Sequence, residues 1–397
     1  MKTHTKYPSL DVVLHSEIDC VMSRFTFFLL LLTITATARA EEIPIAVAGP
    51  ITGPYASIGE QLRRGATMAV ADINAAGGIL GQSVSLRIMD DVCDPKQATL
   101  VASQLVNDGV RFVAGHFCSS ASIPASNVYN DGGVIMISPA STSPTLTERG
   151  LSNVFRVCGR DDQQGVIAAD YIARHFGDQR LAIIHDKTSY GKGLADVTKQ
   201  ALNNAGIHEV LYEGITTGER DFTALITRMK YHNIGVMYVG GYFTEAALLR
   251  RQAHDQGLNI PLISGDALVT REYWTIAGKT GEGTLMTFSP DPRTNPEAAK
   301  VVQAFRDKGY EPEGYTLYNY AAVQVYAQAA KRAGSTDPKA IRDVMHGGTF
   351  HTLLGPITFD AKGDVTKPQY VVYQWSKGEY RELVGDGERK TEDGGRP

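Results

Sequence analysis

Polar side chains follow three strand-like runs of this 397-residue chain, near the points where helices should begin. Ser119 and Thr142 come after two of these runs, and Asp266 comes after a third. Hydroxyls and free backbone N–H groups at such positions suit a carboxylate ligand, whereas an aspartate offers a charged acceptor to a cation. The competing interpretation is ordinary helix capping, which explains most Ser, Thr and Asp residues at the starts of helices.

The common catalytic and cofactor motifs are missing from the sequence. The loop at 190–194 (YGKGL) is similar to a dinucleotide-binding loop, but Asp196 stands where Gly or Ala is needed. His208 and Glu209 begin like a zinc-protease motif, but Tyr212 replaces the second histidine, and neither GxSxG nor CxxC occurs. Solvated turns explain five closely spaced acids better than a metal site or an acid–base pair does: Asp90, Asp91, Asp94, Asp161 and Asp162. We therefore expect no enzyme activity, cofactor or bound metal.

The elements that would position these residues alternate between strand and helix. Short, apolar, β-rich runs, of the kind that is buried on both faces, are separated by runs with helical spacing. Two consecutive β-α-β series predict an α/β protein with two doubly wound parallel sheets. Ligands bind at the carboxyl ends of such strands, so two lobes facing each other there would enclose a cleft. The strand-like runs lie at 45–49, 84–89, 112–115, 134–138, 181–185, 210–214, 236–240 and 261–264.

Residues 22–40 have the pattern of a secretory signal. A short basic start and an apolar run are followed by small residues that end in A-R-A at 38–40. We expect export to the periplasm, cleavage before Glu41 and a soluble mature chain. Residues 1–21 carry acidic side chains that do not suit the start of a signal, so we expect the true start at Met22.

Charge and hydropathy argue against two classes of partner. The formal net charge is −4 at pH 7, and no Lys/Arg run stands out, so nucleic acid is not expected as a partner. No apolar run after the signal reaches membrane length.

Three cysteines follow the signal, and two of them come after neighbouring strand-like runs. Cys93 and Cys118 should end at the same edge of a sheet, where an oxidising compartment would join them. Such a disulfide would stabilise the fold by about 3 kcal/mol. Cys158 would then be a free, buried thiol.

An ordered series of motifs from residue 41 to about 380 resembles a known family. The opening stretch at 49–59 has the pattern G-x-x-TG-x-x-A-x-x-G. It is followed in order by DDVCDPKQA, GHFCSSASIPAS, ISPASTSPTLTERG, IIHDKTSYGKGLAD, GITTGERDF, GGYFTEAALLRRQ, GYTLYNYAA and GPITFDAKGD. Together these motifs resemble the type I periplasmic binding proteins of the Leu/Ile/Val (branched-chain amino acid) ABC transporter family.

The resemblance implies two discontinuous lobes joined by a three-crossover hinge. Lobe one would comprise 41–160 plus 290–370, and lobe two 161–289 plus 371–385, followed by a polar C-terminal tail at 386–397. A protein of this family would bind an amino acid between the lobes and deliver it to the permease subunits of an inner-membrane ABC importer. We expect a monomer without a cofactor.

The resemblance also gives the candidate residues their roles. Ser119 and Thr142 would hold the carboxylate of an amino acid, and Asp266 its ammonium. Ala140 and Ser141 would offer backbone atoms, notably the Ala140 carbonyl, to the ammonium. Two tyrosines after strands of lobe two would close over the ligand: Tyr190 and Tyr242.

Three further positions would shape the pocket for the ligand side chain. Ile58 and Tyr315 stand where leucine-type receptors often carry Tyr and Phe, and Phe117 is bulkier than the aliphatic residue common at its position. Extra aromatic volume could exclude leucine and favour valine, alanine, proline or γ-aminobutyrate. One methylene changes affinity by only about 1–3 kcal/mol, so the sequence leaves these ligands open.

Two other classes of function are weighed against transport. A periplasmic enzyme on the same fold would need a nucleophile within reach of a base, and the sequence signals none. A ligand-sensing module would form a stable complex with a regulator instead of a permease.

Overall fold

The computed structural model describes residues 1–3, 5, 42–384 and 388–389 of the chain. The expected signal at 22–40 lies outside the described residues, as does the expected tail except for 388–389. The fold described below is that of the body that begins at Glu42.

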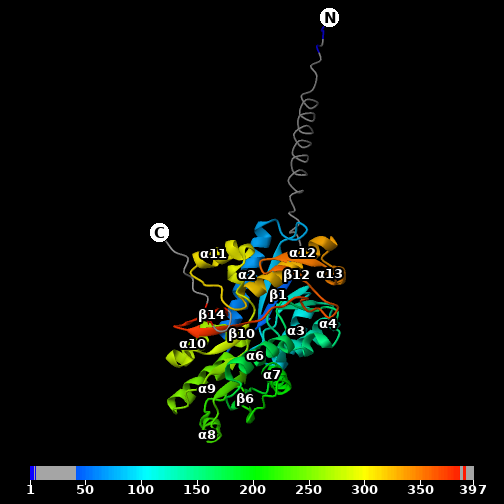
Figure 1. The fold of residues 1–397 in the computed structure, drawn as a ribbon. Coiled ribbons are helices and arrows are strands. Elements are labelled where there is room, and N and C mark those ends of the chain that lie inside the picture. The colour runs from blue at the N-terminus through cyan, green and yellow to red at the C-terminus, as the bar shows by residue number, and fades with distance from the viewer. Residues whose placement is uncertain (4, 6–41, 385–387, 390–397) are drawn as a thin grey trace. The chain divides into compact units, whose positions relative to one another are not determined.

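The first sheet consists of five parallel strands in the order β2-β1-β3-β4-β5 (Figure 1). Helices α2 and α12 cover one face, and α3 and α4 pack together on the other. The strands are buried on both faces at the centre, as their uninterrupted apolar runs predict. The strands are β1 (Ile43–Gly49), β2 (Val84–Asp90), β3 (Phe112–Gly115), β4 (Ile135–Ser138) and β5 (Val154–Arg156).

Helix α2 (Ala56–Ala75) illustrates how the sequence produces this packing. Leu62, Ala66 and Ala69 recur at helical spacing and are buried against the sheet. A side chain at Gly65 would come within 2.1 Å of the Thr316 carbonyl, so glycine allows α2 and α12 (Thr316–Ala333) to approach closely. The other helices of this part are α3 (Pro95–Asn107), α4 (Ser119–Asp131), α5 (Thr145–Glu148), α11 (Ala299–Asp307) and α13 (Pro338–Met345).

The second sheet has the order β15-β14-β13-β10-β9-β8-β6-β7. The pairs among β6 to β10 are parallel, whereas β13, β14 and β15 are added antiparallel. Lys377 and Gly378 join β13 to β14 and both have positive φ, as a tight hairpin turn requires. The strands are β6 (Leu181–His185), β7 (Leu211–Gly214), β8 (Val236–Gly240), β9 (Leu262–Ser264), β10 (Leu285–Phe288), β13 (Val371–Ser376), β14 (Glu379–Val384) and β15 (Glu388–Arg389).

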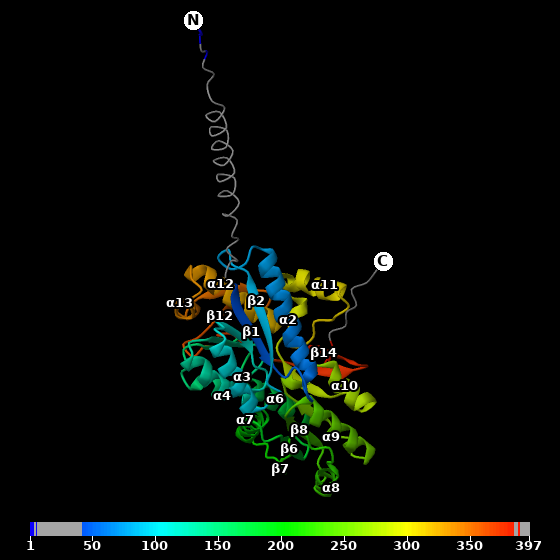
Figure 2. The ribbon, with the colours of Figure 1, turned by 180° about the vertical axis from the view of Figure 1, so that it is seen from behind.

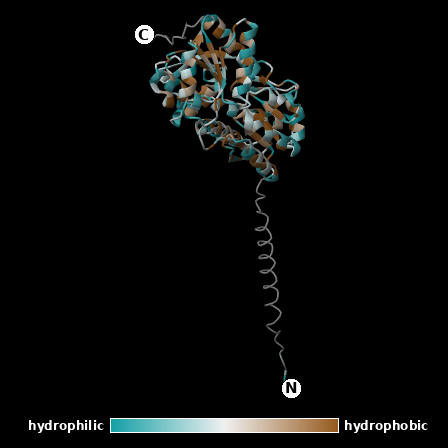
Figure 3. Ribbon diagram, turned by 90° about the horizontal axis from the view of Figure 1, so that it is seen from below, coloured by the Kyte–Doolittle hydropathy of each residue, from teal (hydrophilic) through white to brown (hydrophobic). Residues whose placement is uncertain are grey.

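Helices also cover both faces of the second sheet (Figure 2). Helices α6 and α7 pack against each other and against strands, and α9 packs with α10 and α8. In the hydropathy view, apolar residues gather on the strands and polar residues on the outer faces of helices (Figure 3). None of the helices in the described residues is both long and apolar enough to cross a membrane. The helices are α6 (Asp161–Phe176), α7 (Gly191–Asn204), α8 (Thr223–Tyr231), α9 (Phe243–Asp255) and α10 (Arg271–Ala277).

The chain passes between the two sheets three times, through segments that we call the hinge segments. They comprise residues 157–160, 289–298 and 359–370. Between the second and third passages the chain returns to the first sheet, where α12 packs on α2 and a small hairpin, β11 (Thr349–Thr352) and β12 (Gly355–Thr358), follows. The body therefore has two lobes, each built on one sheet. The exact lobe boundaries given above stay a prediction.

Candidate functional site

A small cavity lies between the two lobes, at the carboxyl ends of strands from both sheets. Its volume is about 10 Å³, so the surrounding rings leave space for about one water-sized group. Seven of the ten residues predicted for ligand binding or the side-chain pocket line it, together with Ala267, which was not predicted. The lining residues are Phe117, Ser119, Ala140, Tyr190, Tyr242, Asp266, Ala267 and Tyr315.

The side of the cavity in the first lobe offers hydroxyls and a helix N-terminus. Ser119 begins the 13-residue helix α4, and its Oγ accepts the Ser143 N–H at 3.3 Å. Thr142 is buried, and its side chain lies beside the Asp161 carboxylate, whose pKa it lowers. Thr142 does not line the cavity, but its loop lies against Ser119. These donors are the groups that a carboxylate needs.

The Ser141 hydroxyl joins two loops of the first lobe. It donates to the Phe117 carbonyl at 2.8 Å and lies 2.5 Å from the Ser122 Oγ. The Ser138 Oγ, at the end of β4, accepts the Ser141 N–H at 2.9 Å and donates to the His116 carbonyl at 2.8 Å. The hydroxyl, the N–H and the carbonyl of Ser141 are therefore all bonded within the protein, and its contact with a ligand stays a prediction.

The side of the cavity in the second lobe is acidic. Asp266 is 2% exposed, and its Oδ1 accepts the Tyr190 hydroxyl at 2.7 Å and the Gln164 Nε2 at 2.9 Å. Its Oδ2 accepts the hydroxyl of Tyr315, which belongs to the first lobe. Burial raises the pKa of Asp266 to about 6, although the bonds from Tyr315 and Tyr190 act in the opposite direction. The carboxylate thus lies in an environment that disfavours its charge until a cation reaches it.

Aromatic rings from both lobes fill most of the space between these polar groups. The Phe117 ring centroid lies 5.5 Å from that of Tyr242 and 5.8 Å from that of Tyr315. Tyr55, which sequence reasoning missed, packs against Tyr242 with centroids 4.6 Å apart and the rings tilted by 40°. Ile58 is fully buried in α2 and is not among the cavity-lining residues, so its pocket role stays a prediction.

Asp161 is a second buried carboxylate near the cavity. It is fully buried at the start of α6. Burial, and next the charge of Asp266, raise its pKa well above the usual value, whereas the Thr142 side chain and the charge of Arg156 act in the opposite direction. Its backbone N–H donates to the Thr142 carbonyl at 2.9 Å, so it lies beside the loop that carries Thr142.

The explanation by solvated turns is wrong for two of the five acids. Asp161 is one, and Asp91 is the other, since it is also fully buried. Its Oδ2 lies 2.5 Å from the His116 Nδ1, and the His116 Nε2 lies 3.0 Å from the Tyr129 hydroxyl. Asp91 follows a strand and Asp161 begins a helix, and at such boundaries the sequence pattern does not show whether another element covers the side chain.

Within the described residues no group of three or more His, Cys, Asp or Glu side chains could hold a metal ion.

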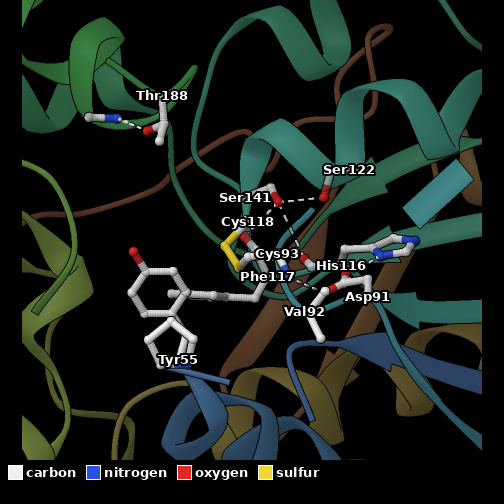
Figure 4. The surroundings of a disulfide bond; sticks show 12 residues. Tyr55, Asp91, Val92, Cys93, His116, Phe117, Cys118, Ser122, Ser141 and Thr188 are labelled. Atoms are coloured by element: carbon white, nitrogen blue, oxygen red, sulfur yellow. Dashed lines mark hydrogen bonds and ion pairs between the residues drawn. A yellow bond between two sulfur atoms is a disulfide. The ribbon is translucent and has the colours of Figure 1, made fainter. Parts of the chain in front are cut away.

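The disulfide between Cys93 and Cys118 is confirmed, and their Cα atoms lie 5.5 Å apart (Figure 4). The strands before the two cysteines are not adjacent, because β1 lies between β2 and β3. All three end at the same edge, which still brings the cysteines together. The bond thus fixes the loop that carries Phe117 and Ser119. Cys158 is free and buried, as expected.

Comparisons with known proteins give matches over most of the chain. A family model described as periplasmic binding protein matches residues 42–379. The Leu/Ile/Val-binding protein homolog 1 of Brucella suis biovar 1 is 52% identical over 338 residues, which cover 85% of this chain and 91% of that protein. The amino acid binding protein of Pseudomonas aeruginosa is 50% identical over 352 residues, covering 88% of this chain and 94% of that protein.

A solved structure shares the two-lobed fold. It is the branched-chain amino acid transporter substrate-binding protein of Streptococcus pneumoniae in complex with isoleucine, with a TM-score of 0.77 and 26% identity. The match covers 88% of this chain and 98% of that chain.

Proposed function

Because this chain belongs to the periplasmic binding protein family, we propose that it binds an amino acid between its lobes and delivers it to the permease of an ABC importer. The observation that carries the proposal is the division of charge across the cavity. Ser119 and the loop of Thr142 supply donors from the first lobe, and Asp266 supplies a buried carboxylate from the second. A zwitterion needs this separation, because its carboxylate requires donors and its ammonium requires acceptors.

Asp161 adds to the acidic side of the proposed site. It is buried near Asp266, whose charge helps to raise its pKa, and the Thr142 side chain and the charge of Arg156 oppose that shift only in part. A buried carboxylate is unfavourable unless a cation compensates its charge. The ligand ammonium would supply that compensation for one or both aspartates.

The relatives support the amino-acid class. The Brucella protein is called Leu/Ile/Val-binding, and the Streptococcus pneumoniae protein was solved with isoleucine. The Pseudomonas relative is named only as an amino acid binding protein, which leaves the side chain open. Transport of a branched-chain amino acid is therefore our first assignment.

A receptor for a smaller or non-α amino acid is the second candidate. Phe117, Tyr242 and Tyr315 pack around the cavity, and the Tyr315 hydroxyl reaches Asp266. These rings must move apart before any amino acid can enter, since the cavity has room for about one water-sized group. A ligand with little side chain, such as alanine, proline, valine or γ-aminobutyrate, requires less movement of the rings than leucine does.

A thermal-shift screen of the chain from Glu41, against all amino acids and γ-aminobutyrate, tests the proposal. A ligand at a hundred times its Kd should stabilise the fold by about 2.7 kcal/mol. Stabilisation by Leu, Ile or Val supports the first assignment, and a response only to smaller ligands supports the second. If the second holds, Phe117→Ala should extend the response to leucine. No response to any compound would contradict the amino-acid class.

We also propose that the mature protein is an exported, soluble monomer. Residues 22–40 carry the signal pattern described above, and the family is periplasmic. Sequencing the N-terminus of protein recovered from the periplasm should give Glu41. Light scattering after size exclusion should give the mass of one chain.

A further inference from the structure

The Asp364 carboxylate connects three separate segments of the protein. It lies in the third hinge segment, 359–370, and is 3% exposed. Its Oδ1 accepts the Arg156 Nε at 2.6 Å, and its Oδ2 accepts the Arg160 Nη1 at 2.7 Å. The Thr147 hydroxyl donates to the same carboxylate at 2.9 and 3.0 Å. One buried side chain thus holds two arginines and a hydroxyl.

Arg156 carries this connection to the loop between β4 and α5, residues 139–144, which we call the ligand loop. Its side chain is fully buried at the end of β5. Nη1 donates to the Ser141 carbonyl at 2.7 Å, and Nη2 donates to the Ser143 carbonyl at 3.0 Å. These carbonyls flank Thr142, so the guanidinium fixes the backbone on both sides of Thr142, in the loop whose Ala140 lines the cavity.

Arg160 carries the connection to the first hinge segment, 157–160. Helix α6 begins at the next residue, Asp161, whose N–H donates to the Thr142 carbonyl at 2.9 Å. The Arg160 side chain also contacts two more exposed acids, Asp162 and Glu148. Through Asp364, the ligand loop and two of the three hinge segments share one hydrogen-bonded network.

Such a network is better suited to orienting the arginine side chains than to stabilising the fold. A buried ion pair contributes little net stability, because removing two charges from water offsets much of their attraction. Its geometry is nevertheless demanding, since each arginine must reach its own carboxylate oxygen. Lobe closure requires backbone rotation in hinge segments, and rotation there would move the carboxylate that holds Arg156.

We propose that Asp364 is a positioning residue that couples the ligand loop to the hinge. It orients Thr142 through Arg156 and fixes the first hinge segment through Arg160. Occupation of the ligand loop and closure of the lobes therefore favour each other. The coupling rests on the proposed function, because it assumes that the ligand loop contacts the transported solute.

The test compares Asp364→Asn with wild type and with Asp162→Asn. The control removes an ion pair from Arg160 at a half-exposed site on α6, which the described contacts join neither to Arg156 nor to the third hinge segment. With the amino acid that gives the largest thermal shift, Asp364→Asn should raise the Kd at least tenfold and reduce the ligand-induced compaction in small-angle scattering. Asp162→Asn should keep both within twofold of wild type. A folded Asp364→Asn protein with unchanged Kd and compaction would overturn the coupling, even if its melting temperature falls.

A second measurement does not need a ligand. In hydrogen–deuterium exchange, Asp364→Asn should speed exchange together in 139–144, 157–160 and 359–370, with the α8 and α9 amides unchanged. Faster exchange in 359–370 alone would mean that Asp364 has only a local structural role, which would refute the coupling. If Asp364→Asn does not fold, Thr147→Val removes one donor at nearly constant volume and should give the same pattern with a smaller amplitude. Failure of wild type to bind any amino acid would contradict the proposed function, while the exchange pattern would still decide the coupling.

Discussion

At the residue scale, the central question is what compensates the charge of Asp266. Three side-chain donors contact it, but it is buried among aromatic rings without a cationic partner of its own. We expect Asp266→Asn to weaken amino-acid binding by about 1.5–3 kcal/mol, the contribution of a charge-assisted hydrogen bond. Calorimetric titration would measure this as roughly a 10- to 150-fold increase in Kd. Asp255→Asn, at an exposed site on α9, is the control, and equal affinities in all three proteins would refute the role of Asp266.

The pH dependence of binding provides a second test of the same carboxylate. Burial raises the pKa of Asp266 to about 6, and a bound ammonium stabilises the ionised form. Above pH 6 the ionised form is already populated, so affinity should be nearly constant. Below pH 6 binding must displace a proton, and affinity should fall by up to about tenfold per pH unit. Titrations between pH 5 and 8 should show this decline in wild type and a flatter profile in Asp266→Asn.

The residues that sequence reasoning found and those that it missed differ in how they reach the site. Ser119, Ala140 and Asp266 follow strands directly, and the ends of parallel strands meet at one edge, so chain order was sufficient to predict them. Gln164 reaches Asp266 across 102 residues of chain, and Arg156 reaches Asp364 across 208. The first pair lies within the second lobe, and the second joins β5 to the third hinge segment. Both depend on packing between elements far apart in the chain, which local periodicity does not encode.

At the element scale, the disulfide closes the chain segment that contains α3 and β3 and leads to the cavity. Cys93 and Cys118 are 25 residues apart, and both lie where strands of the first sheet end. Replacing both by Ser should lower the free energy of unfolding by about 3 kcal/mol, because the unfolded chain regains the freedom of that loop. Denaturant titration would measure the loss.

The same double substitution should also weaken ligand binding. Phe117 and Ser119 flank Cys118, so their positions depend on the bond. We expect weaker binding in the Cys93→Ser/Cys118→Ser protein under conditions where it remains folded. Cys158→Ser is the matched control, since this buried thiol has no disulfide partner and its replacement should leave the Kd nearly unchanged. Equal stability of wild type and the double variant would contradict the prediction.

The element scale also shows the limit of the prediction of parallel sheets. Sequence periodicity predicted the β-α-β series that builds β1 to β4 and β6 to β9, but it did not predict the short strands β5 and β10. It also did not predict the antiparallel addition of β13, β14 and β15, because a hairpin edge carries no crossover helix to mark it. The hairpin supports the site from behind, because the Tyr380 hydroxyl of β14 accepts the Gly314 N–H at 3.2 Å, directly before the cavity-lining Tyr315.

At the scale of the whole molecule, closure of the two lobes requires that contacts form between them. Tyr55, just before α2, packs on Tyr242 and Phe243, and its hydroxyl donates to the Glu245 Oε2 at 3.4 Å. The Glu245 Oε1 accepts the Gly218 N–H at 2.8 Å, and Glu245 is almost completely buried. Closure therefore covers a carboxylate that has no cationic partner in this contact.

The charge of Glu245 should oppose closure and thereby reduce affinity. Burial raises its pKa, and burial likewise raises the pKa of neighbouring Asp186 to about 6, so the closed form favours protonation of both groups. Glu245→Gln keeps an oxygen for the Gly218 N–H and removes the charge. It should strengthen amino-acid binding at pH 7.5 by about fivefold, which corresponds to about 1 kcal/mol of easier closure. The gain should shrink as the pH falls, since wild-type Glu245 then becomes neutral as well. Glu272→Gln, at an exposed position on α10 of the same lobe, should show no gain. An affinity loss in Glu245→Gln would mean that the charge assists closure instead.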